Sequence, residues 1–479
     1  MKYGNLSKLS LVGLIGLSFL SYSCSEENKV DKEIEPEIPE ENIVDKEIEP
    51  ETPEQSEALT PTEQKRKMET IANQFMAEVP SSDFRAIADL FNDLNQEYED
   101  YDWDEAEDWM EECLDDCKEF LGESKETSGS SYGIYNYFYT DYKALYMASN
   151  FAGHFTAQNG VWEYTKAKDL QFIMPKHDCV VKLETSGEVK KVYLGNIEEW
   201  TEGSYEYDYY TDKYVSNEYY DRMQTTIGVP EKITLTLTQG GSNVVKCVVT
   251  TDLSGINDEK LDISKSGLSV TVLTELNNGY KVNLSECDYK ANKSASCALT
   301  VSKKDKTLLA MGVAADVVDL PSYNLDAFVS DELDDDELED KFEDANVSKA
   351  FVKLDILGKL QVQGTVTDVR GFVRKIENAE DNKTKELAFK SYVNQANELM
   401  NVNLFYDGSS TTQAYVKLEP FREEGWYDDD FWWEAEPVIY FYDGSSYSTF
   451  EAFFNEYDFD NVIDAFEELI EDYEGMIED

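Results

Sequence analysis

Alternation of apolar and polar residues, broken by short turn sequences, dominates the chain from about residue 132 onward. The stretch "KITLTLTQGGSNVVKCVVTTDL" alternates threonine with Ile233, Leu235 and Leu237, and Gly240-Gly241 then separates it from a second such run. Period-two alternation predicts strands with one apolar face, and a two-residue glycine turn predicts a hairpin. We therefore expect a large antiparallel β-sheet over 130–479. The same kind of junction recurs at Asn159-Gly160 and Asn278-Gly279.

A helical period precedes the sheet. Residues 63–79 are a first candidate helix, and "SSDFRAIADLFNDLNQEYED" places apolar residues on one face after a Ser81 or Ser82 cap. A third helical pattern ends at Gly122, a residue that suits a helix stop. Acidic residues lie opposite the apolar faces. We expect an N-terminal helical hairpin or small bundle over 63–124.

Two further helices are expected within or after the sheet, near 383–400 and 459–477. The second has an apolar stripe at helical spacing, which consists of Val462, Phe466, Leu469, Ile470 and Tyr473. The fold class that follows is α+β, with an N-terminal helical part, a large antiparallel sheet with inserted helices, and a C-terminal helix.

The sequence "FYDGSS" occurs twice, at 405–410 and 441–446, with strand patterns on both sides. Each Asp-Gly pair is typical of a hairpin turn. A metal or ligand site at the repeated carboxylate is the alternative, and both interpretations remain open.

Charge excludes some classes of partner. The chain has 42 basic and 100 acidic residues, a net charge of −58, and 13% aromatic residues. Such a surface repels phosphate backbones, so we expect no nucleic-acid binding. The aromatic content is too high for a disordered acidic chain, so a folded protein is expected.

The N-terminal sequence predicts where the protein is located. Residues 1–8 include Lys2 and Lys8, residues 9–20 form a short apolar run, and Cys24 follows a few small residues. A basic start followed by a short apolar run is typical of a signal peptide, here over 1–23. A transmembrane helix is not expected, because the apolar run is too short to span a bilayer.

The stretch "LSYSCSEEN" resembles the lipoprotein signals of Bacteroidota, as found among the many lipoproteins of gut species. Ser21 stands where the usual leucine would precede the cysteine, a departure that looser versions of this box share. The resemblance implies that Cys24 carries diacylglycerol and palmitate-type acyl chains that hold the protein in the membrane. It also implies that Ser25, Glu26 and Glu27 direct export to the outer face of the outer membrane.

An acidic, proline-rich linker is expected over 24–62. It contains the tandem repeat "VDKEIEPEIPEENI" and "VDKEIEPETPEQSE", at 30–43 and 44–57. Proline and like charges extend such a segment, so it would hold the folded part away from the membrane.

Cysteine spacing leaves one disulfide open. Cys287 and Cys297 flank "DYKANKSAS" and could face each other across a hairpin, whereas Cys113 and Cys117 lie on one helical face as buried thiols. The remaining two lie in strand patterns and are expected in the core, namely Cys179 and Cys247.

No catalytic machinery stands out. "GSSYG" at 129–133 has the spelling of a nucleophile elbow, but tyrosines follow it instead of a helix. His154 and His177 are the only histidines, too few for a multi-histidine zinc site. The acidic run 331–340 lacks the glycine of a calcium loop and is typical of an amphipathic helix. We expect no metal, no cofactor and no catalytic residue; a carboxylate-based hydrolase is a less favoured alternative.

Two aromatic stretches are the candidate binding sites. "YEYDYYTDKYVSNEYYD" (205–221) and "EEGWYDDDFWWEAEP" (423–437) combine rings with carboxylates, a chemistry suited to sugars or to another protein. The plainer interpretations are a surface loop between strands for the first and rings packed on the sheet for the second. We expect a non-enzymatic ligand- or partner-binding protein, with a glycan as one candidate; the alternative is a lipid or lipoprotein carrier with an open β-cradle. The candidate residues are Tyr205, Tyr207, Tyr209, Tyr210, Trp426, Trp432 and Trp433.

Overall fold

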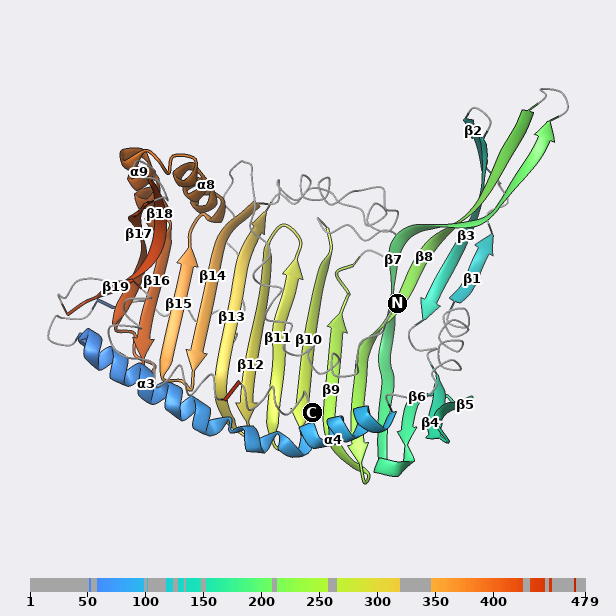
Figure 1. Ribbon diagram of the computed structural model, residues 1–479, viewed down its shortest axis with the longest axis horizontal. Helices are drawn as coiled ribbons and strands as arrows, with labels where there is room; N and C mark the ends of the chain where they lie inside the picture. The colour runs from blue at the N-terminus through green and yellow to red at the C-terminus, as the bar shows by residue number, and fades with distance from the viewer. Residues whose placement is uncertain are drawn as a thin grey trace. The chain divides into compact units, whose positions relative to one another are not determined.

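The computed structural model confirms the α+β fold, with few helices and a large, mostly antiparallel β-sheet (Figure 1). The chain divides into two compact units. Unit 1 comprises 1–99, 271–319 and 343–479, and unit 2 comprises 100–270 and 320–342. The structure describes residues 51–52, 58–98, 101, 118–123, 128–132, 135–147, 152–208, 213–256, 265–318, 346–424, 431–443, 448–449 and 469–470.

Unit 1 contains an antiparallel meander, in which each strand from β11 to β18 pairs with the next one along the chain. The strand β10 (Gly267–Leu276) precedes it, with its residues from Thr271 onward in this unit. The meander consists of β11 (Tyr280–Lys290), β12 (Ser294–Lys303), β13 (Lys306–Val318), β14 (Asn346–Ile356), β15 (Leu360–Val366), β16 (Met400–Tyr406), β17 (Ala414–Glu424), β18 (Phe431–Phe441) and β19 (Ser448–Thr449).

The first Asp-Gly pair is a tight hairpin turn between β16 and β17, as predicted. Asp407 and Gly408 have φ angles of 54° and 68°, which is the left-handed conformation that such a turn requires at both positions. Asn159-Gly160 has the same geometry, with φ angles of 53° and 83°. Gly444, in the second copy, lies outside the described residues.

The predicted first helix is α3 (Pro61–Glu78). Thr60 caps it in a reciprocal capping box: its hydroxyl accepts from the Glu63 amide at 3.3 Å, and Glu63 Oε2 accepts from the Thr60 amide at 2.9 Å. A short 3₁₀ turn, η3 (Ser81–Asp83), follows, and then α4 (Arg85–Tyr98). The predicted serine cap is therefore wrong in detail, because the serines form the turn itself.

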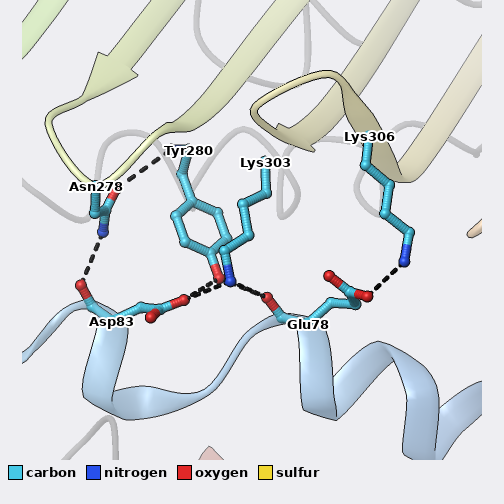
Figure 2. Close-up of polar contacts among 6 residues, drawn as sticks. All are labelled: Glu78, Asp83, Asn278, Tyr280, Lys303 and Lys306. Atoms are coloured by element: carbon cyan, nitrogen blue, oxygen red, sulfur yellow. Dashed lines mark hydrogen bonds and ion pairs between the residues drawn. The ribbon is translucent and has the colours of Figure 1, made fainter.

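We call α3 together with η3 the strap. It crosses the hairpin ends of the meander, and Figures 1 and 2 show its course. Gln64 is fully buried there and donates to the Gln413 carbonyl oxygen at 2.8 Å. Four further side chains reach three hairpins through the pairs Lys67–Asp407 (2.7 Å), Gln74–Lys359 (2.6 Å), Glu78–Lys306 (2.5 Å) and Asp83–Lys303 (2.7 Å).

A helical hairpin lies at the opposite strand ends of unit 1 (Figure 1). It consists of α8 (Val369–Glu380) and α9 (Glu386–Asn397), where the sequence predicted a single helix near 383–400. Asp368 begins α8 by accepting from the Gly371 amide at 2.8 Å. The extra helix was missed because its own cap and apolar residues follow directly on the strand pattern of β15.

Unit 2 departs from the expected all-antiparallel pairing, since β3 pairs parallel with β8 and β4 pairs parallel with β6. The other strand pairs in the described part of this unit are antiparallel: β1 with β3, β2 with β3, β4 with β5, β6 with β7, β7 with β8, and β8 with β9. The strands are β1 (Lys118–Glu123), β2 (Ser128–Tyr132), β3 (Tyr135–Met147), β4 (Gly153–Gln158), β5 (Val161–Thr165), β6 (Leu170–Met174), β7 (Cys179–Asp208), β8 (Lys213–Gln239) and β9 (Ser242–Asp252), with a 3₁₀ turn, η5 (Pro175–His177), between β6 and β7.

Two boundaries and the burial of one strand face differ from the sequence prediction. The end of the predicted third helix is the strand β1, because 118–123 pairs antiparallel with β3. The predicted linker reaches the folded part before residue 62, since Glu51 forms a β-bridge with Thr411. Leu235, expected on an apolar face, is 40% exposed, so that face of β8 is covered only in part.

Several predicted segments fall outside the described residues. These are 1–50, 102–117 with its two cysteines, the acidic run 331–340, and all of 459–477 except 469–470, which are helical.

Candidate functional site

A set of six tyrosines in unit 2, three of them exposed and three half-buried, lies on one face of β3, β7 and β8. We call it the aromatic ribbon, and it consists of Tyr135, Tyr137, Tyr139, Tyr207, Tyr214 and Tyr220.

Strand register explains why these residues share a face. Tyr137 and Tyr139 of β3 lie opposite Glu218 and Tyr220 of β8, so their side chains point the same way. The three β3 tyrosines occupy alternate positions, and alternate side chains of a strand lie on one face. At the start of β8, Tyr214 lies opposite Tyr207 of β7.

The rings contact one another. The centroid of Tyr139 lies 5.6 Å from that of Tyr220 in a stacked arrangement, and Tyr137 lies 6.2 Å from the same ring. Tyr207 and Tyr214 meet edge to face at 5.1 Å. Such pairs contribute about 0.5–1.5 kcal/mol each beyond the area they bury, so the ribbon is an ordered surface.

Polar partners fix the rings in place. The Tyr220 hydroxyl donates to Glu218 Oε2 at 2.7 Å, and this hydrogen bond raises the pKa of Tyr220 to about 12. Arg222 Nε donates to Asp141 Oδ1 at 2.9 Å, and its guanidinium lies 4.4 Å from the Tyr139 ring centroid. Tyr139 is therefore held between a neighbouring ring and a cation.

Much of the ribbon remains open to solvent. Tyr214 is 64% exposed, Tyr135 is 40% exposed and Tyr207 is 38% exposed. On the opposite face of the same strands Tyr219 stacks on Phe138 at 5.1 Å and is 42% exposed. The described part of unit 2 therefore presents aromatic rings to solvent on both faces of these strands.

The sequence prediction identified one side of this ribbon. Tyr207 belongs to it, and Tyr205 lies in β7 opposite Ser216. The plainer interpretation of 205–221 as an inter-strand loop is wrong, because β7 continues to Asp208 and β8 begins at Lys213. Tyr209 and Tyr210 lie outside the described residues. The β3 tyrosines were missed, although "YNYFY" places them at alternate positions.

The tryptophan stretch belongs to unit 1 and is not part of the aromatic ribbon. Trp432 and Trp433 belong to β18 of unit 1, and Trp426 lies outside the described residues. Trp433 packs against the buried cluster that includes Phe389 of α9, and Lys390 Nζ lies 4.3 Å from its ring centroid. Its role is packing, in agreement with the plainer interpretation. Trp432 Nε1 donates to Glu434 at 2.6 Å.

His154 has a firm structural partner. Its Nε2 lies 2.8 Å from Asp169 Oδ1, and Gln171 and Lys182 also contact that carboxylate, at 2.7 Å and 3.4 Å. These contacts lower the pKa of Asp169 to about 2, with the Gln171 hydrogen bond as the largest cause. His177 lies in η5.

The nucleophile-elbow spelling does not have the required structure. Ser131 lies within β2, and the residue after it, Tyr132, pairs with Tyr135 at the start of the strand β3. An elbow needs a strand followed directly by a helix. Among the described residues no group of three or more His, Cys, Asp or Glu could hold a metal ion, and none of their helices is long and apolar enough to cross a membrane.

The possible disulfide is present. Cys287 and Cys297 are bonded across the β11–β12 hairpin. Cys179 is a buried thiol whose pKa is raised by burial, and Cys247 is a half-buried thiol.

Comparison with known proteins returned no match: no family model, no curated protein and no solved structure resembles this chain.

Proposed function

We propose that this chain is a lipid-anchored protein of the bacterial outer-membrane surface that binds a ligand or partner through the aromatic ribbon and performs no catalysis. The signal-like stretch before Cys24 and the acidic pair after it support this location at the outer-membrane surface. The Cys287–Cys297 disulfide agrees with it, because disulfides persist outside the reducing cytosol.

The exposure of the ribbon is the observation that carries the binding proposal. Tyr214, Tyr135 and Tyr207 offer ring faces and hydroxyls to solvent, and the nearby Glu218 and Asp141 offer carboxylate oxygens. Ring faces stack on the apolar faces of sugars, and carboxylates accept hydroxyl hydrogen bonds. The net charge of −58 disfavours anionic polymers, so an uncharged glycan is the ligand that this chemistry fits best.

Binding can be tested with the mature chain on an array of uncharged glycans. Replacing Tyr207 and Tyr214 by alanine should weaken binding at least about tenfold, since rings at the centre of an interface often carry over 1 kcal/mol each. Tyr164→Ala is the matched control, because Tyr164 is also 40% exposed in unit 2 but lies on β5. Equal loss in both variants, or no loss in either, would remove the ribbon as the binding site.

The lipid anchor and the export to the cell surface can be tested separately. Cys24→Ala should release the protein into the soluble fraction, and unchanged membrane attachment would contradict lipidation. Replacing Glu26 and Glu27 by alanine should protect the protein from protease added to intact cells. Equal digestion of variant and parent would remove the export proposal.

The carrier alternative depends on an apolar face that stays open for an acyl chain. Organic extraction of the purified mature chain, produced with Cys24 replaced by serine, followed by mass spectrometry, distinguishes it from the glycan proposal. One fatty acid or phospholipid for each chain would favour a carrier.

A further inference from the structure

The tyrosines of the aromatic ribbon occupy successive steps along β8, which lies between β3 and β7 (Figure 1). We call residues of neighbouring strands that lie directly opposite one another on the ribbon's face a rung. Successive rungs on one face lie two residues apart along each strand. The rungs that carry rings are Tyr207–Tyr214, Tyr135–Ser216, Tyr137–Glu218 and Tyr139–Tyr220, and the next rung is Asp141–Arg222.

The ribbon is longer than one sugar ring. Residues of a strand advance about 3.3 Å each, so neighbouring rungs lie about 6.6 Å apart. The part of β8 from Tyr214 to Tyr220 therefore spans about 20 Å. A sugar ring is similar in width to a tyrosine ring, so one sugar covers about one rung. A ligand that contacts the whole ribbon must be a chain of about four or more sugar rings in line.

The two ends of the ribbon offer different contacts. Its three exposed rings lie in the first two rungs and belong to Tyr207, Tyr214 and Tyr135. The rings further along are half-buried, and the Arg222 guanidinium lies beside the ring of Tyr139. The first two rungs can therefore stack on the apolar faces of sugar rings, whereas the later rungs present chiefly their polar groups.

Polar atoms that could bind a ligand line the later rungs. Glu218 Oε2 accepts from the Tyr220 hydroxyl, but Glu218 Oε1 accepts no hydrogen bond from the part of the chain that the structure describes. The hydroxyls of Tyr135, Tyr137 and Tyr139 likewise form no hydrogen bond with described residues. These hydroxyls follow one another at about 6.6 Å intervals along β3, beside the carboxylate. Donors and acceptors in such a line suit the hydroxyl groups of an extended sugar chain.

The backbone of β7 leaves the Glu218 carboxylate accessible from one side. Gly203 is the residue of β7 that lies opposite Glu218, and it is exposed. Because a glycine has no side chain, β7 places none beside the carboxylate at this rung. In the neighbouring rung the β8 residue is Ser216, a small side chain that is only 3% exposed. A chain could therefore lie along the middle of the ribbon without meeting a bulky side chain at these two positions.

The charges along the ribbon favour a neutral ligand. Glu218 and Asp141 are carboxylates, and Arg222 is the only basic residue in the five rungs. Arg222 Nε is already paired with Asp141 Oδ1 at 2.9 Å. An anionic polysaccharide would thus meet two carboxylates and a cation that has its own counter-ion, so its binding would be opposed by charge.

We infer that the aromatic ribbon binds a straight, uncharged polysaccharide lengthwise along β8, with Tyr207 and Tyr214 stacking on it at one end and Glu218 accepting its hydroxyls further along. The extended chains of cellulose, mannan and xylan have the required form, whereas a starch-type chain coils. This inference rests on the proposed glycan binding and adds to it the shape and the minimum length of the glycan.

A length series tests the inference. The mature chain, produced with Cys24 replaced by serine, is titrated calorimetrically with cello-, manno- and xylo-oligosaccharides from disaccharide to hexasaccharide. In at least one series the hexasaccharide should bind at least about tenfold more tightly than the disaccharide, because it reaches more rungs. Maltohexaose, the coiled counterpart, should bind more weakly than the best of these hexasaccharides.

The outcomes separate this inference from the proposed function. Equal affinity for disaccharide and hexasaccharide would overturn the inference and leave glycan binding in place. Binding of maltohexaose or of a branched glycan, with no binding of the three straight series, would do the same. If the parent chain binds no uncharged glycan at all, the proposed function and this inference both fail.

Two substitutions test the direction of the chain. Glu218 lies about 13 Å along β8 from Tyr214, so a short oligosaccharide stacked on Tyr214 does not reach it. Tyr214→Ala should weaken the hexasaccharide and the shortest oligosaccharide that binds, each at least about fivefold. Glu218→Gln, which keeps an acceptor oxygen for Tyr220, should weaken the hexasaccharide at least about threefold and change the short one less.

The matched control for the second substitution is Glu163→Gln. Glu163 is an exposed carboxylate of unit 2 on β5, away from the ribbon strands, and its replacement should alter neither affinity. Unchanged hexasaccharide binding by the Glu218 variant, or the same loss in the Glu218 and Glu163 variants, would overturn the lengthwise placement on β8.

Discussion

Lys303 Nζ lies 2.7 Å from Asp83 Oδ2 and joins the β12–β13 hairpin to the end of the strap (Figure 2). The same ammonium group donates to the Glu78 carbonyl oxygen at 3.1 Å, and the Tyr280 hydroxyl lies 2.6 Å from that oxygen. The last turn of α3 has no basic residue of its own. Lys303 therefore supplies from the sheet the positive charge that the negative end of a helix favours. This contact lowers the pKa of Asp83 and raises the pKa of Lys303.

Lys303→Met should lower the free energy of unfolding of unit 1 by about 1–2 kcal/mol, because it leaves a carbonyl and a carboxylate without their charged donor. Urea denaturation measures the change. Lys281→Met is the matched control: Lys281 pairs with Glu275 at 2.7 Å on a more exposed surface, and its loss should change the stability less than the loss of Lys303 does. If the two variants unfold at the same urea concentration, the strap contact has no special role.

Asn397, the last residue of α9, binds the backbone of β17 through both ends of its amide. Its Nδ2 donates to the Leu418 carbonyl oxygen and its Oδ1 accepts from the Leu418 amide, each at 2.8 Å. Asn397→Asp keeps the shape but removes the donor and places a negative charge against a carbonyl oxygen, so it should cost about 2 kcal/mol.

The control for this prediction is Asn394→Asp in the same helix. Asn394 is exposed, so the added charge near the helix end should cost only about 0.5 kcal/mol. Thermal unfolding of the two variants at neutral pH compares them. A smaller loss for the Asn397 variant than for the Asn394 variant would contradict the role assigned to this amide.

Sequence reasoning identified features that depend on neighbours along the chain. Asp407-Gly408 is a hairpin turn and 61–78 is a helix, because turn chemistry and helical period act within a few residues. The parallel pairing of β3 with β8 joins Tyr137 to Glu218, across a separation that no local pattern encodes. The candidate stretch 205–221 therefore covered the β7 and β8 parts of the ribbon, and the β3 tyrosines were missed. Trp433 could not be assigned to packing until α9 was placed above it.

The Cys287–Cys297 disulfide closes a short loop within a hairpin that is already paired. Replacing both cysteines by alanine should lower the free energy of unfolding by about 2 kcal/mol, the low end for disulfides, because the loop is short. Cys247→Ala is the control and should cost less, since Cys247 is a half-buried free thiol. Alkylation followed by mass spectrometry should label Cys287 and Cys297 only after reduction. Labelling of both without reduction would exclude the disulfide.

Asp169 should make unit 2 sensitive to acid in a defined range. Its pKa is lowered from 3.8 to about 2, first by the hydrogen bond from Gln171 and then by that from His154. A carboxylate whose folded pKa lies below the unfolded value stabilises the protein above about pH 4, and this contribution is lost as the pH falls toward 2. The pKa can be measured by a nuclear magnetic resonance titration of the Asp169 side-chain carbon. Gln171→Ala should raise it toward 3.8 and move the acid unfolding of unit 2 to higher pH, whereas Asp169→Asn should remove this part of the pH dependence. An unchanged titration in the Gln171 variant would show that the amide does not hold the carboxylate in its charged form.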